Sequence, residues 1–243
     1  ALPISLTNEG LCMFSDSLKH VTTLKNFKLN IDNTNDIYDQ GIGCLMEGVK
    51  NLKNLENLSL ILSSTEITDK SFAYIREALL ELKSLSTLKI IAARCMLTNH
   101  CLKNFRNAFK NMNNLKNLKL VFAHNQITEV GICHLRDSIK MIKGLSRLEL
   151  FLGNCTELQD NALACLNEAI VTMKSIKHLE LSFAECWDLT DQGLSFLGEI
   201  LEKLPQLEYL KLDLDVCFKI TSKAKANLRS AIYSMKNLKY FEV

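Results

Sequence analysis

Leucine and isoleucine recur along this chain at a fixed interval. Seven intervals separate eight anchor residues, and each interval is 30 or 31 residues long. A constant period of this length indicates a tandem array, in which each copy is one structural unit that stacks on the next. The anchors are Leu24, Leu55, Leu85, Leu115, Leu145, Ile176, Leu207 and Leu238.

Each copy contains two different hydrophobic patterns. Three residues after the anchor, apolar residues alternate with other residues, as at Leu58, Leu60 and Leu62, and this period of two predicts a strand with one buried face. Further along, apolar residues recur 8, 12 and 15 positions after an Ile or Leu in all eight copies. The last two steps, of four and three residues, predict one face of an α-helix.

Polar and small residues mark the start of each expected helix. Two residues after the starting Ile or Leu, most copies have Asp or Asn, as at Asp39 and Asp69, and we expect each to cap its own helix. Two residues later the side chain is always small, as at Gly41 and Gly131, which predicts close packing on the neighbouring copy. Alternating strands and helices predict an α/β fold. We expect a right-handed β-α solenoid shaped like a horseshoe, with parallel strands on the concave face and helices on the convex face.

We expect one domain over residues 1–243. It comprises a partial copy in 1–20, seven copies starting near 24, 55, 85, 115, 145, 176 and 207, and a partial strand in 238–243. This array lacks terminal caps, and an uncapped stack exposes apolar faces at its ends. We therefore expect a longer native chain, or a partner that covers an end, for example by end-to-end contact through the uncapped termini.

Composition narrows the choice of partners. The chain is 47% hydrophobic and 23% charged, which is typical of a soluble globular protein. The net charge of +2 gives no support to polyanion binding, and no apolar run approaches the ~18 residues of a membrane span. We expect no nucleic acid and no membrane as partner. Nine cysteines without paired spacing favour reduced thiols and an intracellular, cytoplasmic location.

The turn after each strand carries a recurring motif, Leu-x-Leu-x-x-Cys/Asn-x-(x)-Leu/Ile-Thr-Asp-x-Gly-Leu. It is clearest in 118–132 and 181–194. These residues resemble the leucine-rich-repeat family, in its ribonuclease-inhibitor-like and cysteine-containing branches, although copies of 30–31 residues are slightly long for those branches. The resemblance covers nearly the whole chain. It implies the horseshoe fold and a binding framework.

The resemblance also implies an inward polar ladder that hydrogen-bonds neighbouring turns. Cys155, Cys186 and Cys217 occupy this column in consecutive copies, so a zinc site or redox pair is the alternative to a structural role. Buried cysteines are usually inert, which favours the structural role. The full column is Thr34, Thr65, Cys95, Asn125, Cys155, Cys186 and Cys217.

Little in the sequence points to catalysis. The five histidines fall in five different phases of the repeat, and neither a Gly-x-x-x-x-Gly-Lys phosphate loop nor a Gly-x-Ser-x-Gly elbow occurs. We expect no catalytic residue, metal ligand, cofactor or small-molecule substrate, and therefore no enzyme.

The strand positions that alternate with the buried ones indicate a binding surface. One column is apolar in four consecutive copies, the preceding column changes from basic to acidic, and Arg and aromatic residues lie just upstream. An apolar centre with a charged rim is typical of protein-binding patches, although Ile and Val are also simply good strand formers. The predicted partner site is Ile61, Lys89, Ile91, Lys119, Val121, Arg147, Glu149, Phe151, His178, Glu180 and Tyr209. Trp187 and Phe218 share one slot in adjacent turns, where a secondary contact site and mutual packing are the alternatives.

The sequence thus predicts a non-enzymatic scaffold or adaptor that binds a protein on its concave face. Two other functions stay open. The resemblance extends to Ran GTPase-activating proteins and to substrate receptors of ubiquitin ligases, which implies a regulatory subunit. A structural subunit of a large assembly is the second, and it predicts buried solenoid ends.

Overall fold

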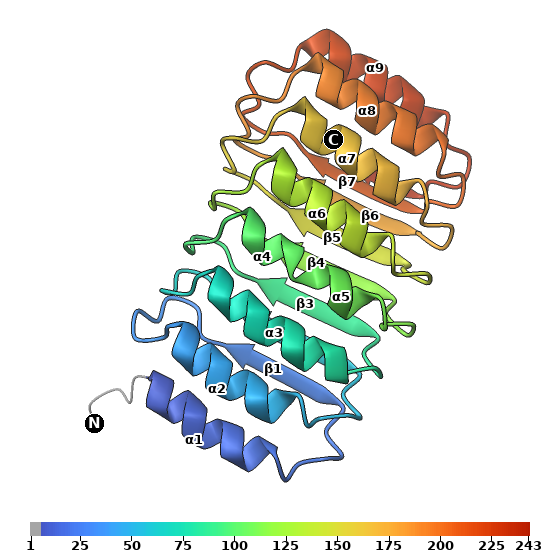
Figure 1. Cartoon of the computed structure of the whole chain (residues 1–243). Coiled ribbons are helices and arrows are strands. Elements are labelled where there is room, and N and C mark those ends of the chain that lie inside the picture. Colours follow the sequence, from blue (N-terminus) through green and yellow to red (C-terminus); the bar gives the residue numbers. More distant parts are fainter. Residues whose placement is uncertain (1–5) are drawn as a thin grey trace.

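The computed structural model describes residues 6–243 as a stack of strand–turn–helix units (Figure 1). All strands belong to one parallel sheet in the order β1 to β8, so each strand pairs with the next one along the chain. The strands are β1 (Asn26–Asn30), β2 (Asn57–Ile61), β3 (Thr87–Ile91), β4 (Asn117–Val121), β5 (Arg147–Phe151), β6 (His178–Ser182), β7 (Tyr209–Asp213) and β8 (Tyr240–Glu242).

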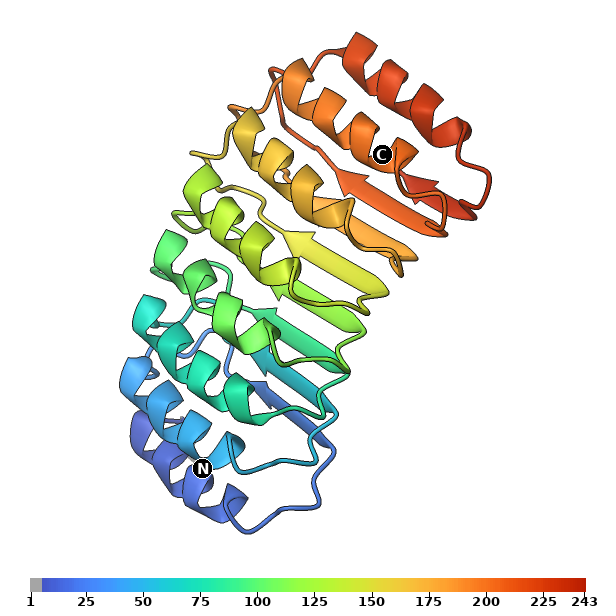
Figure 2. The same cartoon turned by 45° about the vertical axis from the view of Figure 1, so that its right-hand side comes forward.

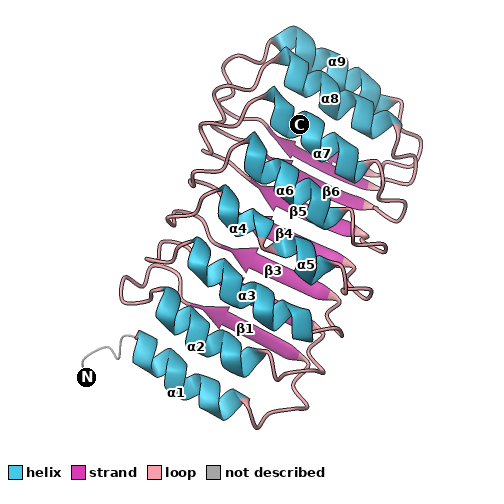
Figure 3. Cartoon of the chain, in the orientation of Figure 1, coloured by secondary structure: helices cyan, strands magenta, loops and turns pink. Residues whose placement is uncertain are grey.

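The helices form a second layer that covers one face of the sheet (Figures 2 and 3). They are α1 (Asn8–Leu18), α2 (Asp39–Val49), α3 (Asp69–Glu81), α4 (Asn99–Lys103), α5 (Phe105–Phe109), α6 (Glu129–Ile139), α7 (Asp160–Ile170), α8 (Asp191–Glu202) and α9 (Ser222–Tyr233). The architecture is the predicted α/β solenoid, in which parallel strands alternate with helices along the chain. Residues 1–5 of the expected first partial copy lie outside the described residues.

The hydrophobic core lies between the sheet and the helices and is continuous along the stack. In β4, Leu118 and Leu120 are buried, whereas Asn117, Lys119 and Val121 on the other face are half-buried. The register pairs residues at equivalent positions of neighbouring copies, so each column of core leucines crosses several strands. Burial of one such side chain contributes about 1.5–3 kcal/mol, and a copy depends on its neighbours to exclude water.

A hydrogen-bonded ladder joins the turns after the strands, as predicted. Asn125 donates from Nδ2 to the carbonyl oxygen of Ala92 at 2.8 Å and accepts from the backbone N–H of Cys95 at 3.1 Å. Cys186 Sγ lies 3.4 Å from the carbonyl oxygen of Leu152. Burial raises the pKa of Cys186 to about 12, so its thiol stays protonated and donates this bond. Zinc ligands and redox nucleophiles are thiolates, which argues for the structural role.

Each ladder residue follows a residue in the left-handed region of the backbone. Their φ angles lie between 54° and 61°, although none of them is glycine. Asn tolerates this conformation well, whereas a β-branched residue such as Val216 is strained in it. The seven residues are Asn33, Ser64, Arg94, His124, Asn154, Glu185 and Val216.

The Asp residues expected to cap their own helices have a different role, as Asp39 shows. Asp39 is the first residue of α2, and its carboxylate accepts from the backbone N–H groups of Thr68 at 2.9 Å and Ser71 at 3.0 Å, at the start of α3. Its assignment as a cap of its own helix is wrong, because the side chain points along the stack to the next copy. The expected close packing is confirmed. A Cβ on Gly131 would lie 2.5 Å from Oδ1 of Asn99, the acceptor for the Gly131 N–H.

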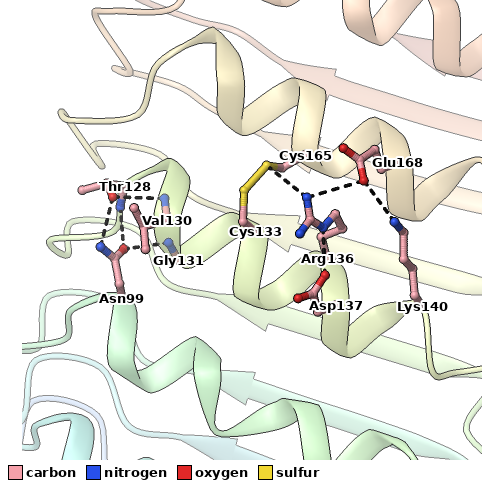
Figure 4. Close-up of a disulfide and its surroundings, with 10 residues drawn as sticks. All are labelled: Asn99, Thr128, Val130, Gly131, Cys133, Arg136, Asp137, Lys140, Cys165 and Glu168. Atoms are coloured by element: carbon pink, nitrogen blue, oxygen red, sulfur yellow. Dashed lines mark hydrogen bonds and ion pairs between the residues drawn. A yellow bond between two sulfur atoms is a disulfide. The ribbon is translucent and has the colours of Figure 1, made fainter.

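Two disulfides join neighbouring helices. Cys12–Cys44 links α1 to α2, and Cys133–Cys165 links α6 to α7 (Figure 4). The expectation of reduced thiols is wrong for these four cysteines. Disulfides persist mainly in oxidising compartments, so the two bonds weigh against the expected cytoplasmic location. The remaining five cysteines are free.

Candidate binding surface on the concave sheet face

All residues predicted to form the partner site lie on the outward face of β2–β7, where the sheet register aligns them in three columns. The apolar column pairs Ile61, Ile91, Val121 and Phe151 in succession. The charged column runs through Lys89, Lys119, Glu149 and Glu180, and the aromatic column through Arg147, His178, Tyr209 and Tyr240. Because neighbouring strands are about 4.8 Å apart, each column is a continuous line of side chains.

The apolar column crosses four strands and then ends. Its four members are half-buried, so each keeps part of its side chain open to solvent. At the next two positions the column becomes polar, and Ser182 donates from Oγ to Oδ2 of Asp213 at 2.8 Å. The apolar stripe is therefore confined to β2–β5, in the middle of the concave face.

The charged column is neutralised at its centre. Glu149 receives Lys119 Nζ on one carboxylate oxygen at 2.5 Å and Arg147 Nε on the other at 2.7 Å. Burial raises the pKa of Glu149, but its hydrogen bonds and ion pairs with Lys119 and Arg147 outweigh this and keep the pKa below its ordinary value. Lys119 Nζ also lies 4.6 Å from the ring centroid of Phe151, a cation–π contact that joins the charged and apolar columns.

The aromatic column is a stack of flat rings. The rings of His178 and Tyr209 are 3.9 Å apart and nearly parallel, and the rings of Tyr209 and Tyr240 are 4.7 Å apart. Burial and the neighbouring charge of Arg147 lower the pKa of His178 to about 4, so its imidazole is neutral at neutral pH. The sequence prediction omitted Tyr240. Its signal was the repeat phase, since it follows its anchor by two residues, as Tyr209 does.

A shallow pocket of about 430 Å³ opens on this face, across β3, β4 and the start of β5. Lys89, Lys119, Arg147 and Glu149 line it together with Thr87 and Asn117, which the sequence prediction missed. Asn117 donates from Nδ2 to Oγ1 of Thr87 at 3.2 Å and so forms a polar wall. The pocket gives the surface a recess that a partner side chain can enter.

Glu149, His178 and Glu180 bring their potential ligand atoms within 4.8 Å of one another. The sequence analysis compared the histidines only with one another, and this group contains one histidine, His178, whose Nε2 is buried and makes no hydrogen bond to the described residues. Both oxygens of Glu149 are already paired with Lys119 and Arg147, which a divalent cation would have to displace. We interpret the cluster as part of the ion-pair network.

Trp187 and Phe218 are exposed on the edge of the array, by 47% and 79% respectively. Within residues 6–243 their rings make no stacked or edge contact with each other. A secondary contact site at this edge stays a prediction.

Comparison with known proteins adds little. No family model and no curated protein matches the sequence. One similar solved structure is described as Leiomodin-1 Actin-Binding Site 2 (ABS2), with 11% identity, coverage of 79% of this chain and 86% of that chain, and a TM-score of 0.42. A likeness at this level carries no argument about function. Separately, no helix in residues 6–243 combines the length and the apolar character that a membrane span needs.

Proposed function

We propose that this chain is a non-enzymatic scaffold or adaptor that holds a protein partner against its concave sheet face. The observation that carries the proposal is the apolar column Ile61, Ile91, Val121 and Phe151, which stays partly open to solvent beside a pocket and a network of paired charges. Apolar centres surrounded by polar groups are typical of protein interfaces, where a few central residues carry most of the binding energy.

The ion-pair network beside the apolar column favours binding of one specific partner. Lys119, Arg147 and Glu149 hold one another in place, so their orientation is set before a partner arrives and little side-chain entropy remains to be lost. Lys89 and Glu180 form no salt bridge within the described residues. We propose that these two free charges orient the partner along the stack.

The test is a quantitative pull-down from native cell extract with three proteins. They are the wild type, the double variant Ile91→Glu/Phe151→Glu, and the control Val130→Glu. Val130 is an exposed apolar residue on α6, so the control adds a charge without touching the concave face. Circular dichroism first shows that all three proteins are folded.

The expected result is one partner that the wild type and the control capture equally. The double variant retains at most about one-thirtieth of it, because a lost central contact costs about 2 kcal/mol or more. Capture by all three proteins would overturn the concave-face proposal and direct attention to the solenoid ends or to the edge at Trp187.

Three narrower assignments remain proposals. The cysteine ladder supports placement in the cysteine-containing branch of leucine-rich-repeat proteins. A regulatory subunit and a structural subunit are compatible with the same surface, and identification of the captured partner separates them. The intracellular location also stays a prediction. Alkylation of the protein from its native source, after unfolding without a reductant, tests it. Five alkylated cysteines indicate intact disulfides, and nine indicate a reducing compartment.

A further inference from the structure

Charge is strongly segregated along this chain. Residues 82–128 contain eight Lys and Arg but no Asp or Glu, whereas the rest of the chain has 21 basic and 27 acidic residues. The small net charge conceals this separation. Because a solenoid keeps sequence neighbours together, this segment forms a basic slab across the middle of the stack, comprising β3, α4, α5 and β4 (Figure 1).

On the convex side the basic residues gather around a pocket of about 500 Å³, between α4–α5 and α6. Lys103, Arg106 and Lys110 line it from one side, spaced so that they share one helical face. His134 and Met141 line it from the other side, and Asn107 completes it. Among residues 6–243, no acidic side chain lines the pocket.

The helix in this copy is divided at Asn104, between α4 and α5. Asn104 donates from Nδ2 to the carbonyl oxygen of His100 at 3.0 Å and accepts from Nη1 of Arg76 at 3.1 Å. Its backbone stays right-handed helical, with φ −66° and ψ −22°. The direction of the chain is therefore kept through the break, and Lys103 and Arg106 remain on the same side.

Several basic residues elsewhere on the convex face, although not all of them, have acidic partners. In α6, Arg136 pairs with Asp137 at 2.9 Å and with Glu168 at 3.4 Å, and Lys140 pairs with Glu168 at 3.1 Å (Figure 4). In α3, Arg76 pairs with Glu77. Where these three residues are neutralised, the partner is an acid on the same helix or on the next copy.

Lys103, Arg106 and Lys110 lack this compensation. None of them forms a salt bridge within residues 6–243, and all three are exposed. Their seven-residue span is about 10 Å of helix, a distance over which like charges repel appreciably at low salt. An anion in the pocket removes this repulsion.

We propose that the pocket is a binding site for a small ligand that carries two or more phosphate groups. One phosphate carries about −1.5 to −2 charges at neutral pH, so two match the three cations better than a single carboxylate does. The guanidinium of Arg106 offers a planar fork that suits phosphate oxygens, and lysines add mobile charges. Asn107 and His134 add side-chain nitrogen groups at the rim. The volume lies within the range of small-molecule sites, about 300–1,000 Å³.

The test is isothermal titration calorimetry with inorganic pyrophosphate at low salt, on the full chain. The wild type is compared with the triple variant Lys103→Gln/Arg106→Gln/Lys110→Gln. A charge-matched control is Lys203→Gln/Lys223→Gln/Lys236→Gln, which removes three exposed lysines near α8 and α9. The expected result is one site per chain, weakened at least tenfold in the triple variant and less than twofold in the control. Arg106→Lys keeps the charge but removes the fork, and we expect it to weaken binding about threefold.

Further probes separate the sources of anionic charge. Citrate carries comparable charge on carboxylates, and vesicles with phosphorylated inositol lipids present phosphate on a membrane. Equal affinity for citrate and pyrophosphate would overturn the phosphate assignment in favour of an acidic protein segment. Binding to vesicles without binding to pyrophosphate would overturn it in favour of a membrane surface. No binding of pyrophosphate, or equal weakening in the triple variant and its control, would also refute the proposed pocket. If the triple variant fails to fold, Arg106→Lys decides the question.

Discussion

Asn125 occupies the centre of the ladder that joins the turns, and replacing it tests how far the array depends on this ladder. Its Nδ2 donates to the carbonyl oxygens of Ala92 at 2.8 Å and Phe122 at 2.9 Å, and its Oδ1 accepts from the N–H of Cys95 at 3.1 Å. The side chain is only 7% exposed, so water cannot readily replace these bonds. Leucine has a similar volume but neither donates nor accepts.

The expected cost follows from the number of bonds. Each neutral hydrogen bond contributes about 0.5–1.5 kcal/mol, and a buried group left without a partner costs about 1–3 kcal/mol. Partial relaxation of the turn reduces the sum, so Asn125→Leu should lower the free energy of unfolding by about 3 kcal/mol. Asn125→Cys is the matched control, because Cys155 holds the next rung with a single contact of 3.5 Å from its Sγ to the carbonyl oxygen of Phe122. It should cost about 1 kcal/mol.

Urea unfolding followed by far-ultraviolet circular dichroism measures both variants, with a wild-type-like slope as the check on cooperative unfolding. The order wild type, Asn125→Cys, Asn125→Leu in stability is the expected outcome. If Asn125→Leu loses less than about 0.5 kcal/mol, the error expected from denatured-state effects, the ladder does not join the copies in the way described.

Three further predictions concern stability. Val216 is 47% exposed at φ 61°, so Val216→Asn relieves backbone strain without loss of packing and should stabilise the chain by about 1 kcal/mol; a lower urea midpoint contradicts this. Loss of Cys133–Cys165 through Cys133→Ser should lower the free energy of unfolding by about 3–4 kcal/mol, given a sequence separation of 32, and an unchanged value contradicts the bond. Because the pKa of His178 is lowered from 6.5 to about 4, the unfolded chain binds a proton that the folded chain does not. Stability should therefore be lost as pH falls from 6.5 to 4, by about 1–2 kcal/mol after solvent screening, and His178→Asn should remove that part of the slope.

The fold could be predicted because its determinants repeat. A fixed interval between Leu115, Leu145 and equivalent residues sets the length of each copy, and periods of two and about 3.6 assign the strand and the helix within it. The ladder was predictable from the family resemblance for the same reason. Asn125 and Cys186 occupy equal phases, so one rule places both.

The contacts between copies were harder to predict. Asp39 accepts hydrogen bonds from the start of the following helix and does not cap its own helix, because the direction of its side chain depends on how the copies stack. Cys12 and Cys44 are one residue out of phase, which conceals their pairing from a comparison of equal positions. The shared separation of 32 in both disulfides was the available signal.

The sequence predicted which residues form the candidate surface, but it did not predict which of their side chains pair with one another. The columns of outward residues follow from strand register, which the repeat fixes. The strand register does not predict that Glu149 pairs with both Lys119 and Arg147. These ion pairs depend on side-chain rotamers in a partly buried setting. The convex pocket was missed because the net charge of the chain averages over its basic and acidic segments.

Hydrogen exchange with and without the captured partner tests the central claim most directly. Amides of β2–β5 and of the loops that precede them report on the concave face, and amides of α3–α7 report on the convex face. We predict slower exchange in the peptides that span 57–61, 87–91, 117–121 and 147–151, with unchanged exchange in the helices. Protection confined to the helices, or to α1 and β8 at the ends of the stack, would contradict the concave-face account.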